Sequence, residues 1–206
     1  MKYSLFLASN SASRKSLLAQ ADIPFQIIPQ NADESLCDMN REISLVVSEL
    51  AQLKMNHAIL PQGQFNGHII FVLTADTLTK DIHGTLHGKP SDRHDAIRIL
   101  KLCRAGTIIG TAFCLQKLRW HHDSWEVVDT ILEYDQASCI MNVPDEFLDF
   151  YLDRIPFLTI SGAIDIAGIG DQFLQEVNGS YSAVLGLPMC KVRQSLYTLG
   201  FYDQKN

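Results

Sequence analysis

The residues best suited to chemistry in this chain are a carboxylate, two lysines and a short polar loop. Asp76 directly follows an apolar run over residues 68–75. We therefore expect Asp76 at the carboxyl end of a buried strand, the place where ligands gather in open α/β sheets. A carboxylate there can bind a divalent cation or act as a general base. The alternative is that Asp76 only caps the next turn through its own backbone.

The opening of the chain has the pattern of a phosphate-binding turn. After an apolar run over residues 3–8 come small hydroxyl residues and two cations, including Ser9, Ser11, Ser13, Arg14 and Lys15. The pattern predicts a strand, a tight turn and a helix N-terminus whose backbone N–H groups can hold a phosphate, with Arg14 and Lys15 adding mobile positive charge. The alternative is that Ser11 or Ser13 simply caps a helix and Arg14 is solvated.

Two lysines and an acidic loop complete the candidate set. Lys89 lies between Gly88 and Pro90, which fix the backbone and limit where its amine can reach. Its amine could contact phosphate, but an ordinary surface lysine is the commoner outcome. Glu34, with Asp33 beside it, falls in a polar loop predicted over residues 30–40, and Lys54 falls on a helix predicted over residues 44–59. Each of these alone is weak evidence, because acidic loops and helical lysines are usually solvated.

Length and composition exclude several classes. A chain of 206 residues with 47% hydrophobic residues can bury the core of one α/β domain spanning residues 1–206. Its net charge of −6 argues against binding a nucleic acid polymer or an anionic membrane, since both need a cationic face. Five separated cysteines without a C-x-x-C pair predict reduced thiols in the cytoplasm. No apolar segment approaches the roughly 20 residues that span a bilayer.

Strand and helix signals alternate along the chain and must position these residues. Two long strands, over residues 107–118 and 125–141, flank a polar turn at His121-His122-Asp123-Ser124, which predicts an antiparallel pair. A further strand is expected over residues 25–29. Helices are expected from Ser91 or Asp92 to Cys103, over residues 144–152, and between Pro188 and Gly200. The fold class is therefore α/β with a mixed sheet.

In this order, the motifs resemble the Maf family of nucleoside triphosphate pyrophosphatases. Residues 7–14, Leu-Ala-Ser-Asn-Ser-Ala-Ser-Arg, are similar to the family's opening L-A-S-x-S-P-R-R. Five more matches follow at similar spacing: Asp33-Glu34, Leu50-Ala51-Gln52-Leu53-Lys54, Ala75-Asp76-Thr77, Gly88-Lys89-Pro90 and Gly186-Leu187-Pro188. Six ordered matches from the first strand to the final helix are more specific than any single one.

The resemblance implies a mixed twisted β-sheet flanked by helices, two-lobed with a central cleft, of the inosine triphosphatase-like Maf type. It implies hydrolysis of a nucleoside triphosphate between the α and β phosphorus atoms, with Mg²⁺ or Mn²⁺, and it allows a homodimer. Asp76 would accept the proton, Lys54 and Lys89 would offset phosphate charge, and Glu34 with Asp76 would bind the metal. The residues that would bind substrate are Ser9, Ser11, Ser13, Arg14, Thr77 and Ala167.

The chain departs from the family pattern in the opening loop and at positions linked to nucleobase specificity. Ala12 and Ser13 stand where the family has proline and arginine, so one cation is missing. Members that take dTTP and UTP resemble A-G-x-Y-G-I-Q where residues 161–167 read Ser-Gly-Ala-Ile-Asp-Ile-Ala. Members that take 7-methyl-GTP carry tryptophan in the loop, glutamine after the aspartate and glutamate near the later position. Thr77 matches the pyrimidine type, whereas Ser13 and Ala167 match neither type. The preferred nucleobase is therefore left open.

Other functions fit less well. A P-loop is excluded because Pro90 follows Lys89, and an aspartyl-phosphate phosphatase would need a carboxylate where Leu78 stands. His121, His122 and Asp123 could ligate a metal, but they lie in the predicted hairpin turn. Aromatic side chains could stack on a base, although a core position is the simpler interpretation for Phe173, Trp125 and Tyr181. The second hypothesis is a nucleotide-binding regulatory protein of cell division with little activity.

Overall fold

A computed structural model describes residues 4–203. Seven strands form one mixed sheet in the order β2-β1-β3-β5-β6-β7, with β4 paired to β3. The strands are β1 Ser4–Leu7, β2 Phe25–Ile27, β3 Ile69–Lys80, β4 Leu86–His87, β5 Thr107–His121, β6 Ser124–Met141 and β7 Leu174–Gly179. The predicted α/β class, a mixed sheet flanked by helices, is confirmed.

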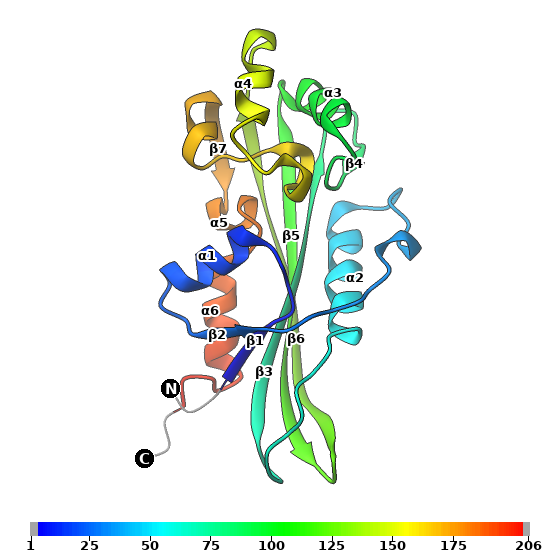
Figure 1. Ribbon diagram of the computed structural model, residues 1–206, viewed down its shortest axis with the longest axis vertical. Helices are drawn as coiled ribbons and strands as arrows, with labels where there is room; N and C mark the ends of the chain where they lie inside the picture. Colours follow the sequence, from blue (N-terminus) through cyan, green and yellow to red (C-terminus); the bar gives the residue numbers. More distant parts are fainter. Residues whose placement is uncertain (1–3, 204–206) are drawn as a thin grey trace.

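The helices lie on both sides of the sheet and around one end of it (Figure 1). The α-helices are α1 Ala12–Gln20, α2 Ile43–Asn56, α3 Arg93–Cys103, α4 Leu148–Leu152, α5 Tyr181–Val184 and α6 Met189–Thr198. Short 3₁₀ helices are η1 Glu34–Leu36, η2 Asp145–Phe147, η3 Phe157–Thr159, η4 Ser161–Ala163 and η5 Gly168–Phe173. In the described part of the chain, no helix is both long enough and apolar enough to cross a membrane.

The sheet is parallel on one side and antiparallel on the other. Strand β1 runs parallel to both β2 and β3, whereas β3, β5, β6 and β7 pair in antiparallel fashion. The predicted antiparallel pair of long strands is thus confirmed. Their turn is tighter than expected, because only His122 and Asp123 separate β5 from β6. Both residues have positive φ, 44° and 62°, as a two-residue hairpin turn that follows the strand twist requires.

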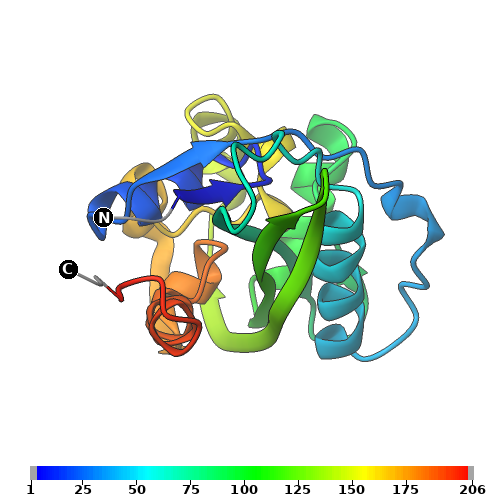
Figure 2. The same ribbon diagram turned by 90° about the horizontal axis from the view of Figure 1, so that it is seen from below.

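Alternate residues of the central strands face two different apolar cores. Phe6, Ile70 and Val72 pack with helix α2, while Leu7 and Leu73 pack with α1 and α6 on the opposite face. Figure 2 looks from below and shows α2 on one side of the sheet and α6 on the other. Because both faces are covered, β1 and β3 read as continuous apolar runs rather than as alternating patterns.

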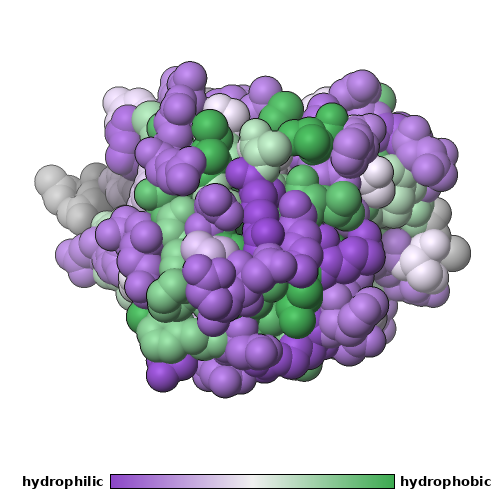
Figure 3. All heavy atoms as spheres, turned by 90° about the horizontal axis from the view of Figure 1, so that it is seen from above, coloured by the Kyte–Doolittle hydropathy of each residue, from purple (hydrophilic) through white to green (hydrophobic). Residues whose placement is uncertain are grey.

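A third apolar cluster lies at the end of the sheet that carries α3 and α4, at the top of Figure 1. The fully buried Tyr151 belongs to it. Arg93 joins the two helices by ion pairs to Asp149, at 2.7 Å, and Asp153, at 2.8 Å. Seen from above, the surface of this end is mostly hydrophilic, with apolar side chains in separate groups (Figure 3).

Strand β3 differs from its prediction in a way that matters for the site. It does not end at Asp76 but continues to Lys80, because β5 pairs with it in register from Ile69 to Lys80. The strand that does end here is β1: Leu7 is its last residue, and the Ala8 N–H donates to the Leu73 carbonyl at 2.9 Å. Asp76 therefore lies three residues beyond the position that pairs with the carboxyl end of β1, within β3 rather than after it. The first strand was predicted from residue 3, which lies outside the described residues.

Several short elements were not predicted, among them β4, β7 and α5. The five cysteines, in contrast, are all free, and Cys103, Cys114 and Cys139 are buried. Reduced thiols were expected from the sequence, and the unpaired state of all five agrees with that expectation.

Candidate functional site

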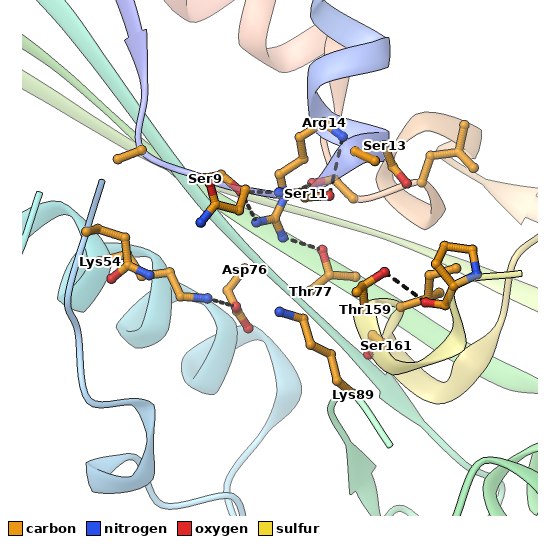
Figure 4. Close-up of a pocket in the computed structure, with 18 of the residues that line it drawn as sticks. Ser9, Ser11, Ser13, Arg14, Lys54, Asp76, Thr77, Lys89, Thr159 and Ser161 are labelled. Carbon is orange, nitrogen blue, oxygen red and sulfur yellow. Dashed lines mark hydrogen bonds and ion pairs between the residues drawn. The ribbon is translucent and has the colours of Figure 1, made fainter. Parts of the chain in front are cut away.

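One pocket of about 470 Å³ lies where the opening loop, α2, β3 and the segment after β4 meet. It is lined by nine of the ten residues predicted for the site: Ser9, Ser11, Ser13, Arg14, Glu34, Lys54, Asp76, Thr77 and Lys89. Three cations and two carboxylates therefore share one cavity, as Figure 4 shows for most of them. The polar environment and the size suit a charged small molecule.

Lys54 links the two carboxylates of the pocket. Its amine forms an ion pair with the Asp76 Oδ1 atom and a second one, at 3.0 Å, with the Glu34 Oε1 atom. The side chains of Lys54 and Asp76 are 8% and 10% exposed, whereas that of Glu34 is 47% exposed. Helix α2 buries Lys54 by presenting it on the same face as its apolar residues, so the amine reaches the sheet rather than solvent.

Asp76 is poised as an acceptor. Burial raises the pKa of Asp76, while the charges of Lys54 and Arg14 oppose that rise. Only its Oδ1 atom is engaged by a described residue, through Lys54. The other oxygen makes no hydrogen bond within residues 4–203 and is not sealed from solvent. It can therefore accept a proton or coordinate a cation.

Arg14 is held rigidly, contrary to the prediction of a mobile charge. Its Nε atom donates to the Gly186 carbonyl at 2.8 Å, and Nη1 donates to the Ala75 carbonyl at 2.8 Å and to Ser9 Oγ at 3.1 Å. Residue Arg14 is only 8% exposed. Burial lowers the pKa of Arg14, whereas nearby carboxylates oppose the shift, and a guanidinium stays charged in proteins. The guanidinium thus joins the opening loop, β3 and the turn before α6.

A chain of hydroxyl groups continues from Arg14 into the sheet. Arg14 Nη2 donates to Thr77 Oγ1 at 3.0 Å, and Thr77 Oγ1 lies 2.9 Å from Thr111 Oγ1. Thr111 Oγ1 donates to the Ala183 carbonyl at 2.7 Å, so the Thr77 hydroxyl is the donor between the two threonines. Thr77, for which substrate binding stays a prediction, therefore supports Arg14.

Among the described residues, Lys89 is the pocket cation without a hydrogen-bond or ion-pair partner. It is exposed, it makes no ion pair with any described residue, and its amine points into the cavity toward Asp76 (Figure 4). The backbone beneath it is firmly attached. The Gly88 carbonyl accepts from the Gly162 N–H at 2.8 Å, and the His87 carbonyl accepts from Ser161 Oγ at 3.0 Å.

A buried pair that the sequence did not reveal anchors this segment further. His87 Nε2 lies 2.8 Å from Asp81 Oδ2, and both residues are buried. Burial alone would raise the pKa of Asp81, but hydrogen bonds from His87 and from the Thr85 and His83 N–H groups together lower it. The sequence indicates that Asp81 begins a polar turn. It does not indicate the contact with His87, because that contact depends on the pairing of β3 with β4.

Comparison with known proteins identifies the family of this chain. Residues 4–199 match the family model described as Maf-like protein. The chain belongs to the Maf family. The family resemblance of the motifs is thereby confirmed.

Curated relatives of this Maf-like chain match it over nearly its whole length. It is similar to a dTTP/UTP pyrophosphatase of Caldicellulosiruptor bescii, with 30% identity covering 96% of this chain and 95% of the relative. It is 31% identical to a dTTP/UTP pyrophosphatase of Shewanella frigidimarina, over 92% and 94% of the two chains. A protein of Chlamydia pneumoniae named nucleoside triphosphate pyrophosphatase is 30% identical, over 97% and 95%.

Some predicted residues of the Maf-like chain do not reach the main pocket. Ala167 lines a second, adjoining pocket instead. Asp33 caps η1, where its Oδ1 atom accepts from the Ser35 N–H at 3.1 Å and from Ser35 Oγ at 2.6 Å. Among the aromatic candidates, Phe173 is buried in the core, as expected, and Trp125 is partly buried against the apolar core beside helix α2. The core position expected for Tyr181 is wrong, because Tyr181 is 49% exposed. Neither Trp125 nor Tyr181 lines either pocket.

The carboxylates of the Maf-like site fit a divalent cation that arrives with its phosphate ligands. Within residues 4–203 no group of three or more His, Cys, Asp or Glu side chains could hold a metal ion, and the His121–Asp123 turn is included in that result. Asp76 and Glu34 are two hard oxygen donors that meet at one amine. Mg²⁺ is commonly bound by one or two carboxylates together with substrate phosphates and water. This donor set therefore suits Mg²⁺ or the similar Mn²⁺.

Proposed function

We propose that the protein hydrolyses a nucleoside triphosphate between its α and β phosphorus atoms, giving a nucleoside monophosphate and pyrophosphate. The observation that carries the proposal is the position of Asp76 in one pocket with Arg14, Lys54 and Lys89. A triphosphate is a polyanion, and these three cations can offset its charge. The names of the relatives, which are pyrophosphatases of dTTP and UTP or of nucleoside triphosphates, support the same reaction.

Asp76 acts as the general base in this proposal. Its free carboxylate oxygen accepts a proton from water while the water oxygen attacks the α phosphorus, and the bond to the bridging oxygen of pyrophosphate breaks. Lys89 lies on the opposite side of Asp76 from Lys54 (Figure 4), and its amine can pair with the departing pyrophosphate. The opening loop offers the backbone N–H groups at the start of α1 and the hydroxyls of Ser9, Ser11 and Ser13 to the phosphates.

A divalent metal is part of the proposal. Asp76 and Glu34 would hold Mg²⁺ or Mn²⁺, which supplies positive charge to the phosphate oxygens when it is bound. Lys54 keeps the two carboxylates together. We also propose a cytoplasmic location, which the five free cysteines support, and a homodimer stays a prediction from the family.

The test is pyrophosphate release from a panel of nucleoside triphosphates with Mg²⁺ or Mn²⁺, with the second product identified. Monophosphate as that product supports the proposal, and diphosphate with inorganic phosphate contradicts it. We expect a chelator to abolish turnover. Binding without turnover of any nucleotide would instead support the regulatory protein.

The Asp76→Asn variant tests the role of Asp76 as general base. We expect kcat to fall by about 100-fold or more while nucleotide binding is largely kept, because the amide cannot accept the proton. Glu49→Gln, a change of an exposed carboxylate that does not line the pocket, is the control. An undiminished rate in Asp76→Asn would remove Asp76 from the mechanism.

A further inference from the structure

A second pocket of about 330 Å³ adjoins the first. The two cavities share residues 11–13 of the opening loop and, on the opposite wall, Pro156, Thr159, Ile160 and Leu185. The inference drawn from this pocket rests on the proposed function. If phosphates occupy the first cavity, the remainder of a nucleotide must extend into an adjoining space, and this pocket shares its walls with the first.

Half of the residues that line the second pocket are apolar and half are polar, among them Ser16, Gln20 and Thr159, and the lining carries a single charge. Its apolar lining includes Leu17, Ile160 and Leu185, which suit the flat faces of a nucleobase better than the hydroxyls of a sugar. Asp165 is the one charged residue among the described residues that line it. The cations of the first pocket do not line this one, so no lysine or arginine competes for the Asp165 carboxylate here.

Asp165 is fixed by its own backbone and by a core residue. Its N–H donates to the Tyr151 hydroxyl at 2.8 Å, and that hydroxyl in turn donates to the Ala163 carbonyl at 2.8 Å. Tyr151 is fully buried, so this support is rigid. Gly170 packs directly over the Asp165 carbonyl, because a Cβ atom at residue 170 would lie 1.6 Å from that oxygen. The backbone of Asp165 therefore has little freedom to move.

One oxygen of the Asp165 side chain is left for a ligand. Oδ1 accepts from the Ala167 N–H at 3.1 Å, whereas the other carboxylate oxygen makes no hydrogen bond with any residue in the described part of the chain. That oxygen is not sealed from solvent. Partial burial raises the pKa of Asp165, although the Ala167 N–H opposes the rise. Such a group gains more from a ligand donor than a fully hydrated carboxylate would.

A carboxylate accepts hydrogen bonds and, when ionised, offers none. The Watson–Crick edge of guanine presents two neighbouring donors, N1–H and the N2 amino group. Uracil and thymine present one N–H between two carbonyl oxygens, and those oxygens would face the negative charge. We propose that Asp165 determines base preference, selecting a base with neighbouring N–H donors, such as guanine, over uracil and thymine. This preference would separate the protein from relatives named dTTP/UTP pyrophosphatase.

Binding of the monophosphates tests this inference without requiring catalysis. We expect the Kd of GMP to be about tenfold lower than that of UMP or dTMP, as one good bidentate contact to a base allows. In Asp165→Asn, Oδ1 can still accept from Ala167, but an amino donor replaces the free oxygen. The GMP preference should therefore fall to about threefold or less. A measurement with dGMP separates the effect of the base from that of the sugar. If the base decides binding, dGMP should bind like GMP.

Asp171→Asn is the matched control, since Asp171 is exposed on η5 and lines neither pocket. Thermal unfolding should show the same Tm for both variants and the parent. A wild-type preference for UMP or dTMP, an equal loss for every base, or an effect that follows the 2′-hydroxyl would each overturn the inference. The kcat/KM ratio of GTP to UTP should change in parallel. Turnover with an unchanged ratio in Asp165→Asn defeats only the role of Asp165, whereas absence of turnover with every nucleotide defeats the proposed function.

Discussion

Arg14 and Lys89 place positive charge in the same pocket, yet the structure surrounds them in opposite ways. Arg14 is 8% exposed and donates to two carbonyls and two hydroxyls. Lys89 is exposed and makes no ion pair with a described residue, while the backbone just before it, at His87 and Gly88, is anchored. A cation can thus serve a site by holding its walls together, as Arg14 does, or by leaving its charge uncommitted, as Lys89 does.

The largest expected effect comes from removing the cation that holds the walls. Arg14→Ala would strip donors from the buried Ala75 and Gly186 carbonyls and should lower the free energy of unfolding by about 3 kcal/mol. Urea denaturation measures this loss. Arg14→Lys restores the charge but not the planar set of donors, so it should recover only a small part of the stability. Full recovery by lysine would show that Arg14 contributes charge alone.

Lys89→Ala should have the opposite profile. We expect kcat/KM for the preferred nucleotide to fall by about 30-fold, because one charge-assisted contact to phosphate is lost. Unfolding free energy should change by less than about 0.5 kcal/mol, as for other exposed side chains. Lys15→Ala is the control, since Lys15 lies near the opening loop but lines neither pocket. An equal loss in the control would point to a general charge effect.

A smaller effect should follow from the threonine chain beside Arg14. Thr111→Val removes the hydroxyl between Thr77 and the Ala183 carbonyl. That carbonyl also accepts from the Gly186 N–H, so it keeps one partner. We expect a loss of about 1 kcal/mol in unfolding free energy, measured in urea, with kcat/KM nearly unchanged. A loss as large as that of Arg14→Ala would mean that the chain, rather than the guanidinium, sets the geometry.

The smallest effect concerns the anchor under Lys89 and depends on pH. Because the pKa of Asp81 is lowered by folding, the ionised carboxylate stabilises the folded state above the unfolded pKa of about 3.9. This contribution is lost as pH falls through the lower folded pKa. We expect the urea midpoint to fall more steeply below about pH 4 in the parent than in Asp81→Asn, which cannot titrate. If the urea midpoints of the parent and of Asp81→Asn change in parallel with pH, the lowered pKa of Asp81 is contradicted.

Short motifs identified residues that lie together in one pocket, although their roles stay predictions. Glu34, Lys54, Asp76 and Lys89 each belong to a local pattern, and all four line one pocket. The burial of β1 and β3 on both faces could also be predicted, because strands covered on both faces are continuous apolar runs. The family resemblance added the order of the motifs, and the family is confirmed. The two-lobed shape that it implies stays a prediction.

Features that depend on distant pairing could not be predicted. Arg14 meets carbonyls 61 and 172 residues away in sequence, so nothing local indicates that it is buried. The continuation of β3 past Asp76 follows from its register with β5, not from its own residues. Strand β7 is mostly exposed and carries little apolar signal. Ala167 was assigned to the substrate, but only the three-dimensional arrangement separates its pocket from the main one.

The uneven distribution of charge has a consequence for how a ligand approaches. The whole molecule carries −6, while the main pocket holds three cations and two carboxylates. At physiological ionic strength, fields decay over about 8 Å, so an anion far from the surface meets weak repulsion and only a nearby one meets attraction. Capture of a nucleotide is therefore a short-range event, and added salt, which screens both fields, should alter the association rate far less than it does for proteins with a broad cationic face.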